Sequence, residues 1–148
     1  MNILVAISYY TPYVSGLTIY AQRLAEELAK RGHTVSVLTS QHQKDLPVKE
    51  VINHVSIIRV PYLLRISKGF IMPLYILEVF KAVRNQDCIV INLPQLEGCI
   101  VALCTKLLGK RLFCIYHCEV RLPKSLLNNI TVYILHIANA ISLLLADR

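Results

Sequence analysis

The first 39 residues constrain the fold most, because they combine two strand patterns with one helix pattern. Residues 3–7 (ILVAI) form a short apolar run, which predicts a strand buried on both faces. Residues 8–17 contain proline and glycine and predict a loop. Apolar residues then recur at helical spacing from Thr18, the predicted N-cap, as far as Gly32, and residues 34–39 (TVSVLT) predict a second strand. This order predicts a βαβ unit with a right-handed crossover.

The rest of the 148-residue chain continues the alternation and suits one domain, residues 1–148. A hairpin predicted over residues 48–60 reverses the chain twice, so its second strand runs parallel to the first two strands. Two more strands are predicted at residues 88–92 and 112–117, and helices at 70–83, 98–108 and 125–146. We therefore predict an α/β fold, a Rossmann-like parallel sheet with helices on both faces and the strand order 3-2-1-4-5.

Composition excludes several classes of protein. Hydrophobic residues make up 55% of the chain and charged residues 17%, which is the reverse of what a disordered chain needs. The apolar excess indicates strands buried on both faces, or contact with a membrane or a second domain. The dinucleotide-binding pattern GxGxxG and the phosphate-binding pattern GxxxxGK[ST] are both absent, which argues against a dehydrogenase or a P-loop enzyme.

The charge balance and the cysteines bear on partners and compartment. Lys and Arg total 16 against 9 Asp and Glu, and the resulting charge of +7 attracts phosphate, nucleic acid or anionic lipid. The basic residues form no dense run and no nucleic-acid-reading motif appears, so no nucleic acid partner is expected. Five cysteines without CxxC spacing favour reduced thiols and a cytoplasmic location. No Lys or Arg precedes Arg23, which argues against a secretory signal.

Ligands of open α/β sheets bind beyond the carboxyl ends of the strands, and three segments are predicted to lie there, 8–18, 92–98 and 116–123. The first of them leads into a helix N-terminus, where free N–H groups and the helix dipole favour an anion such as phosphate. Gly16 would let the backbone approach that anion closely. The alternative is that Gly16 only makes a turn.

His117 lies at the end of the last predicted strand, where an imidazole can bind a sugar hydroxyl or phosphate or take up a proton. Glu119 is its neighbour and could orient it or bind a hydroxyl. The alternatives are a histidine satisfied by local backbone and a solvated carboxylate. Cys114 and Cys118 flank His117, but alternation along a strand points Cys114 and His117 to opposite faces, and no second cluster completes four ligands. No metal site is therefore expected.

Two features bear on membranes. Residues 125–146 contain no Asp, Glu, Lys or Arg and are long enough to span a bilayer. The polar side chains within them favour a buried or interfacial helix instead, and they include Asn128, Asn129, Thr131, His136, Asn139 and Ser142. The segment 59–84 holds five basic residues, of which Arg65 and Lys68 flank an apolar stretch. That combination suits an anionic membrane surface, and a solvated helix rim is the alternative.

Four segments together resemble the N-terminal half of glycosyltransferase family 4, whose members have two Rossmann-like domains (the GT-B fold). The matching stretches are Tyr10-x-Pro12-x3-Gly16 with residues 24–40 (LAEELAKRGHTVSVLTS), 54–61 (HVSIIRVP), 86–94 (QDCIVINLP) and 108–119 (LGKRLFCIYHCE). The closing ADR at 146–148 resembles the start of a further family motif. The family usually has two adjacent glycines where this chain has Ser15 and Gly16. The chain therefore departs from the family pattern at position 15, and the departure concerns how closely the backbone there can approach a phosphate.

The resemblance implies a retaining enzyme that moves a sugar from a nucleotide-diphosphate donor to a hydroxyl acceptor, lipid-linked acceptors included, with no metal or other cofactor. It places Ser15 and Gly16 near the donor diphosphate and the acceptor, and His117 with Glu119 in the cleft. It also implies that the donor-binding half lies outside residues 1–148. We therefore expect a truncated N-terminal domain that transfers no sugar alone, located in the cytoplasm or at the cytoplasmic membrane face.

Two other classes of function stay open at this point. The first alternative is a non-catalytic Rossmann-like module that docks on a membrane surface or a partner. The second is a different Rossmann-like nucleotide enzyme.

Overall fold

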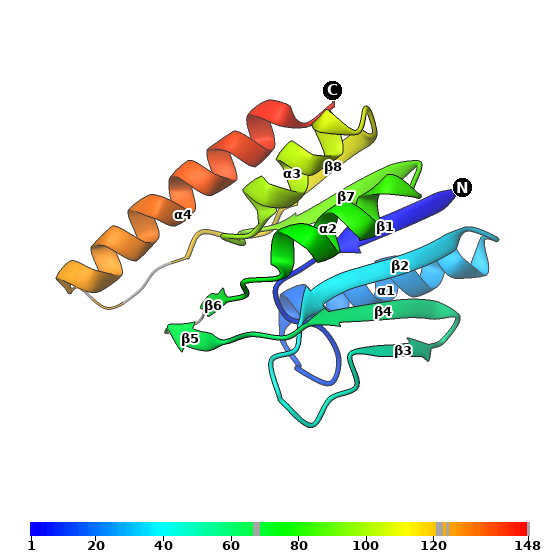
Figure 1. The fold of residues 1–148 in the computed structure, drawn as a ribbon, viewed down its shortest axis with the longest axis horizontal. Helices are drawn as coiled ribbons and strands as arrows, with labels where there is room; N and C mark the ends of the chain where they lie inside the picture. Colours follow the sequence, from blue (N-terminus) through cyan, green and yellow to red (C-terminus); the bar gives the residue numbers. More distant parts are fainter. Residues whose placement is uncertain (67–68, 121–122, 124, 148) are drawn as a thin grey trace.

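A six-stranded sheet forms the centre of the molecule in the computed structural model, which describes residues 1–66, 69–120, 123 and 125–147 (Figure 1). Its order is β3-β4-β2-β1-β7-β8, and every neighbouring pair is parallel except β3 with β4. The strands are β1 (Asn2–Ala6), β2 (Thr34–Ser40), β3 (Lys49–Ile52), β4 (Val55–Val60), β7 (Cys88–Leu93) and β8 (Arg111–Tyr116). Ile3 pairs with Cys88, so the predicted order 3-2-1-4-5 is confirmed, with β3 added as an antiparallel edge.

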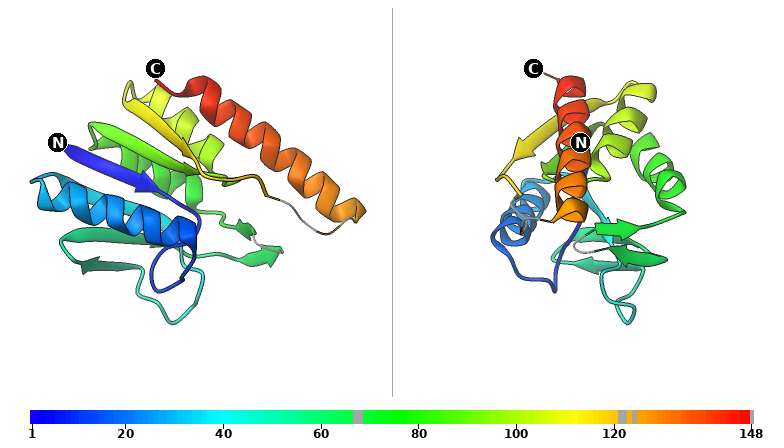
Figure 2. Two further views of the ribbon diagram at one scale, coloured as in Figure 1. Left: turned by 180° about the vertical axis from the view of Figure 1, so that it is seen from behind. Right: turned by 90° about the vertical axis from the view of Figure 1, so that its left-hand side faces the viewer.

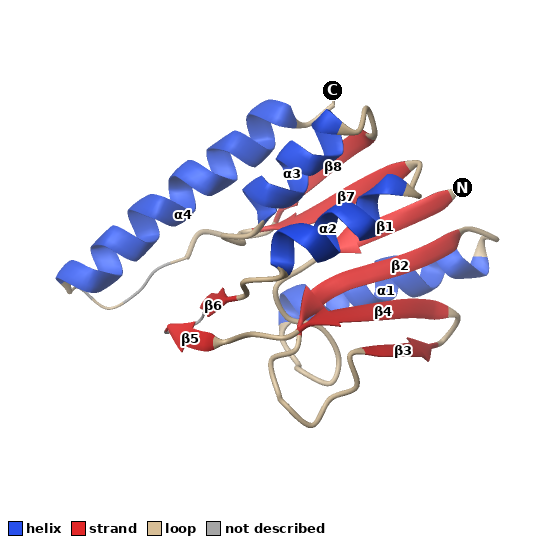
Figure 3. Cartoon of the chain, in the orientation of Figure 1, coloured by secondary structure: helices blue, strands red, loops and turns tan. Residues whose placement is uncertain are grey.

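Helices cover both faces of the sheet, as predicted (Figures 2 and 3). α1 (Gly16–Lys30) packs on one face, and α2 (Tyr75–Arg84) and α3 (Gly98–Leu107) pack on the other. Leu4 packs in the core cluster that contains α2 and α3, whereas its neighbour Val5 packs in the cluster that contains α1. Because successive strand residues point to opposite faces, an uninterrupted apolar run is the pattern that such a doubly covered strand requires.

Two boundaries differ from the sequence-based expectation. The helix predicted over residues 70–83 begins only at Tyr75, because Phe70 belongs to a small hairpin of β5 (Leu64–Ile66) and β6 (Gly69–Ile71). The predicted N-cap of α1 is wrong as well. Ser15 caps the helix, and Thr18 is the third helical residue, whose hydroxyl accepts a hydrogen bond from the Ser15 N–H at 2.8 Å. Both residue types cap helices well, so residue type alone did not separate them.

α4 (Leu126–Leu145) lies beside α3 at the edge of the molecule (Figure 1). Ala138, Asn139 and Ser142 are buried, and the Asn139 side chain accepts a hydrogen bond from the Gln95 backbone N–H at 3.3 Å. Within the described residues, α4 is the one helix with the length and composition to cross a membrane, and the stretch Asn128–Leu145 has a mean hydropathy of 1.4 with 17% of it buried. The burial expected for a buried or interfacial helix therefore holds for one face of α4, and its other described side chains are half-buried or exposed.

Candidate active site

The carboxyl ends of β1, β7 and β8 meet at one edge of the sheet, which we call the carboxyl edge, and the described residues of the three segments predicted to bind ligand follow these strands there. The Ser8 hydroxyl, which follows β1, donates a hydrogen bond to Glu97 at 3.2 Å. The Asn92 side chain in β7 lies 3.0 Å from His117, which follows β8. Two side-chain hydrogen bonds therefore connect distant parts of the chain at this edge.

The N-terminus of α1 opens onto the carboxyl edge. The Ser15 hydroxyl accepts a hydrogen bond from the Thr18 N–H at 3.2 Å, which satisfies one of the backbone donors that every helix start leaves unpaired. A side-chain carbon added to Gly16 would meet no described atom within 4 Å, and the φ angle of Gly16 does not require glycine. Gly16 therefore makes no left-handed turn, and it leaves open space in front of the helix. The roles predicted for Ser15 and Gly16 at a phosphate stay predictions.

His117 is oriented by contacts on two sides. Its backbone N–H donates to Leu93 at 3.0 Å and extends the ladder between β7 and β8. Its Nε2 faces the Asn92 Oδ1, and its ring meets the Tyr20 ring edge-on at 4.8 Å between centroids. An amide oxygen can only accept, so Nε2 carries the hydrogen and Nδ1 presents a lone pair. Burial lowers the pKa of His117, which favours this neutral form.

A cavity of about 210 Å³, which we call the Glu97 cavity, lies between the first loop, the segment after β7 and α4. Its lining includes Ser8, Gln95 and Glu97 as polar groups, and Leu135 from α4. Glu97 is only 8% exposed, and its Oε1 has no hydrogen-bond partner among the described residues. Burial raises the pKa of Glu97, an effect that its own backbone N–H, the Ser8 hydroxyl and the backbone N–H of Phe70 oppose. A buried carboxyl group with an unused oxygen is thus present beside the first loop.

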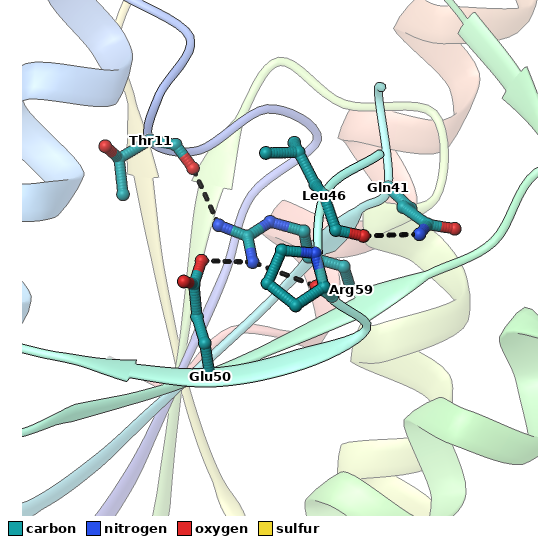
Figure 4. Close-up of polar contacts among 6 residues, drawn as sticks. Thr11, Gln41, Leu46, Glu50 and Arg59 are labelled. Carbon is teal, nitrogen blue, oxygen red and sulfur yellow. Dashed lines mark hydrogen bonds and ion pairs between the residues drawn. The ribbon is translucent and has the colours of Figure 1, made fainter. Parts of the chain in front are cut away.

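Arg59 fixes the other side of the first loop (Figure 4). Its side chain is fully buried, its Nη2 donates to the Thr11 carbonyl at 2.8 Å, and its Nη1 donates to the Pro47 carbonyl at 3.1 Å and pairs with Glu50. The sequence places Arg59 among the basic residues of the predicted membrane-facing segment 59–84. That prediction is wrong for Arg59, because its side chain is buried and cannot reach a membrane surface. The residue belongs to the interior because it ties together the first loop, residue 47 and β3.

The remaining site predictions are placed as follows. Arg65 is exposed, with its guanidinium carbon 5.8 Å from the Phe70 ring centre, and Lys68 lies outside the described residues. Glu119 is exposed in the loop after His117. The described residues hold no cluster of three metal-binding side chains, and all five cysteines are free thiols, of which Cys88 and Cys104 are buried.

The mostly parallel sheet, with polar groups gathered at its carboxyl edge, defines a Rossmann-like α/β domain. The family model for Glycosyltransferase Family 4 matches residues 14–148, and the chain belongs to this family. No curated protein matches the chain.

Two solved structures share the fold. Both are sucrose-phosphate synthase from Thermosynechococcus elongatus, at 18% identity. The first has a TM-score of 0.53, and the match covers 80% of this chain and 33% of that structure's chain. The second has a TM-score of 0.57, and the match covers 93% of this chain and 70% of that structure's chain. This chain thus spans about a third of the first structure. These matches confirm the fold predicted for the N-terminal half of a GT-B enzyme.

Sequence reasoning identified the segment 92–98 by topology but missed the residues within it that carry polar chemistry. Glu97 and Gln95 are buried, and nothing in their local pattern distinguishes them from a solvated loop. Asn92 was not predicted either, although its position gives a signal, because a polar residue that ends an apolar strand (CIVIN) needs a partner when buried.

Proposed function

We propose that this chain is the acceptor-side domain of a glycosyltransferase that moves a sugar from a nucleotide-diphosphate donor to a hydroxyl acceptor, with retention of the anomeric configuration. In this reaction the bond from the anomeric carbon to the diphosphate oxygen breaks, and a bond from that carbon to the acceptor oxygen forms. The acceptor hydroxyl gives its proton to the leaving diphosphate oxygen, and the protonated nucleoside diphosphate leaves. We propose that no metal is needed, and that the reaction takes place in the cytoplasm.

The orientation of His117 is the observation that carries this proposal. Asn92 holds Nε2, so the Nδ1 lone pair is the group left to accept a hydrogen bond from a sugar hydroxyl. The N-terminus of α1 lies at the same edge, where its dipole favours the negative charge that develops on the leaving diphosphate. Glu119 is proposed to bind a substrate hydroxyl in the same loop.

The test is a transfer assay on the natural polypeptide that contains this chain, with nucleotide-diphosphate sugars as donors and release of nucleoside diphosphate as the readout. We expect His117→Ala to lower turnover by about 10²–10⁴, the usual cost of losing one positioned polar or acid–base group. His136→Ala, an exposed histidine on α4, is the matched control and should keep wild-type turnover. Full activity of His117→Ala with an unchanged circular dichroism spectrum would contradict the proposal.

Contact with a membrane is a second proposed property, because apolar side chains are exposed around Arg65. Leu63 is 76% exposed, and Leu64 and Ile71 in the β5–β6 hairpin are 53% and 45% exposed. Exposed apolar groups next to Lys and Arg suit the surface of an anionic bilayer. Arg65 and Lys68 are the proposed headgroup contacts.

Flotation tests this contact by comparing binding to anionic phosphatidylglycerol vesicles with binding to phosphatidylcholine vesicles, which carry no net charge. Binding should be confined to the anionic vesicles and should weaken at 1 M salt, where the Debye length falls to about 3 Å. Arg65→Gln combined with Lys68→Gln should weaken it, whereas Arg23→Gln, an exposed change on α1, should not. Equal binding to both vesicles at both salt concentrations would exclude electrostatic docking.

A further inference from the structure

Three polar side chains of the Glu97 cavity, Ser8, Gln95 and Glu97, which we call its floor, offer more hydrogen-bond acceptors than donors. The Ser8 hydroxyl lies 3.2 Å from Glu97 Oε2 and 3.4 Å from Gln95 Oε1, but its single hydrogen can serve only one of them at a time. The Gln95 amide N–H is directed to the Ala6 carbonyl at 3.3 Å. Glu97 Oε1 has no partner among the described residues, and Glu97 makes no ion pair with any of them. A ligand group that hydrogen-bonds to Glu97 Oε1 would therefore be a donor, since a carboxylate oxygen only accepts.

The walls of the same cavity are mainly apolar. Leu17 comes from the start of α1, Leu96 from the segment after β7, and Val132 and Leu135 from α4. Further apolar side chains of α4, including Ile134 at 48% exposure, continue outside it. Apolar walls favour a ligand with an apolar group, since burying such a group releases water from both surfaces.

The size of the cavity limits which part of a ligand it encloses. About 210 Å³ is below the roughly 300–1,000 Å³ of sites that enclose a whole drug-sized molecule. The cavity is therefore large enough to enclose only part of such a ligand.

We propose that the Glu97 cavity binds an amphiphilic acceptor, with a hydroxyl group that donates to Glu97 and an apolar group that packs against Leu135 and α4. This inference rests on the proposed glycosyltransferase function and names the chemical class of its acceptor. It assigns Glu97 as a binding residue and Leu135 as a residue that determines specificity.

Calorimetric titration of the purified 148-residue chain tests the proposal without a sugar donor, with two probes that share one head group. Octyl β-D-glucoside, kept below its micelle-forming concentration, has hydroxyls and an apolar chain, and methyl β-D-glucoside has the hydroxyls alone. We expect the octyl compound to bind at least tenfold more tightly. Equal affinity for the two probes would overturn the proposal, because the apolar walls would then contribute nothing.

Variants separate the two halves of the cavity. Glu97→Leu should weaken octyl glucoside at least tenfold, and Leu135→Ala should weaken octyl glucoside while leaving methyl glucoside unchanged. Leu144→Ala is the matched control, since Leu144 is 84% exposed on the same helix and does not line the cavity. Should Glu97→Leu fail to fold, Glu97→Gln replaces it, and a smaller loss of affinity is expected because one acceptor oxygen remains. Wild-type affinity in the folded Glu97 variant would overturn the proposal.

Failure of this inference is distinguishable from failure of the proposed function. Transfer of sugar to octyl β-D-glucoside at a rate that Leu135→Ala leaves unchanged would overturn the amphiphilic acceptor and keep the glycosyltransferase. Probe binding in the cavity, together with no transfer from any nucleotide sugar, would overturn the proposed function instead.

Discussion

Two buried charged side chains contact the first loop from opposite sides, and they differ in how completely they are paired. Arg59 contacts the loop through Nη2, which donates to the Thr11 carbonyl, and its Nη1 donates to the Pro47 carbonyl and pairs with Glu50, leaving Nε as its one unpartnered nitrogen among the described residues. Glu97 contacts the loop through Ser8 alone and has no counter-ion among the described residues.

This difference separates a structural charge from one available to a ligand. A buried charge costs free energy unless its partners are present, so a domain keeps an unpaired one only where something else completes it. Arg59 has its partners within the fold and serves to hold the loop. Glu97 has an unused oxygen in a cavity, which is why we assign it to a ligand.

The largest effect is expected from Arg59→Ala. Removing the guanidinium leaves the Thr11 and Pro47 carbonyls and the Glu50 carboxylate without their donor, and breaking a buried pair costs about 3 kcal/mol or more. Chemical denaturation should show this loss in the free energy of unfolding. Arg84→Ala, an exposed change at the end of α2, should stay within about 0.5 kcal/mol of wild type. A loss of similar size in both variants would remove the special role of Arg59.

Glu97→Gln should change the free energy of unfolding in the opposite direction, toward greater stability at high pH. The raised pKa of Glu97 means that its contribution to stability is present at low pH and is lost as the pH rises through that pKa. Glutamine does not titrate, so the stability of the variant should increase relative to that of wild type as the pH rises from 4 to 8. The gain should reach about 2 kcal/mol, the cost of an unsatisfied buried polar group. Thermal unfolding across this pH range measures it, and a constant difference would show that the charge of Glu97 costs nothing.

A smaller effect is expected from Ser15→Ala. The variant loses the helix cap that Ser15 gives to Thr18, which is worth about 1 kcal/mol. Ser15→Gly should restore most of the loss, because glycine is a tolerated N-cap. Urea denaturation of the two variants gives the comparison, and equal stability of wild type and Ser15→Ala would show that the cap does not contribute.

The sequence predicted the sheet well because doubly covered strands have an unambiguous pattern. The run of residues 3–7 can only be buried on both faces, and parallel strands restrict the connections between them. The carboxyl edge followed from topology, and His117 from its place after a strand. The sequence could not predict the burial of Arg59 and Glu97, because burial of a charge depends on partners from distant segments. Glu50 and Thr11 are nine and 48 positions from Arg59 along the chain.

The most direct measurement of the central claim, that substrate binds at the carboxyl edge, is mapping of backbone amide NMR shifts in the 148-residue chain during titration with octyl β-D-glucoside. We predict that the shifted amides lie in residues 8–18, 95–98, 116–120 and 131–135, with Glu97 and His117 among them. Gly32 and Gly109 lie in turns that lead into β2 and β8 at the opposite edge of the sheet, and their amides should not move. Shifts centred on Gly32 and Gly109, with none at Glu97, would contradict the account.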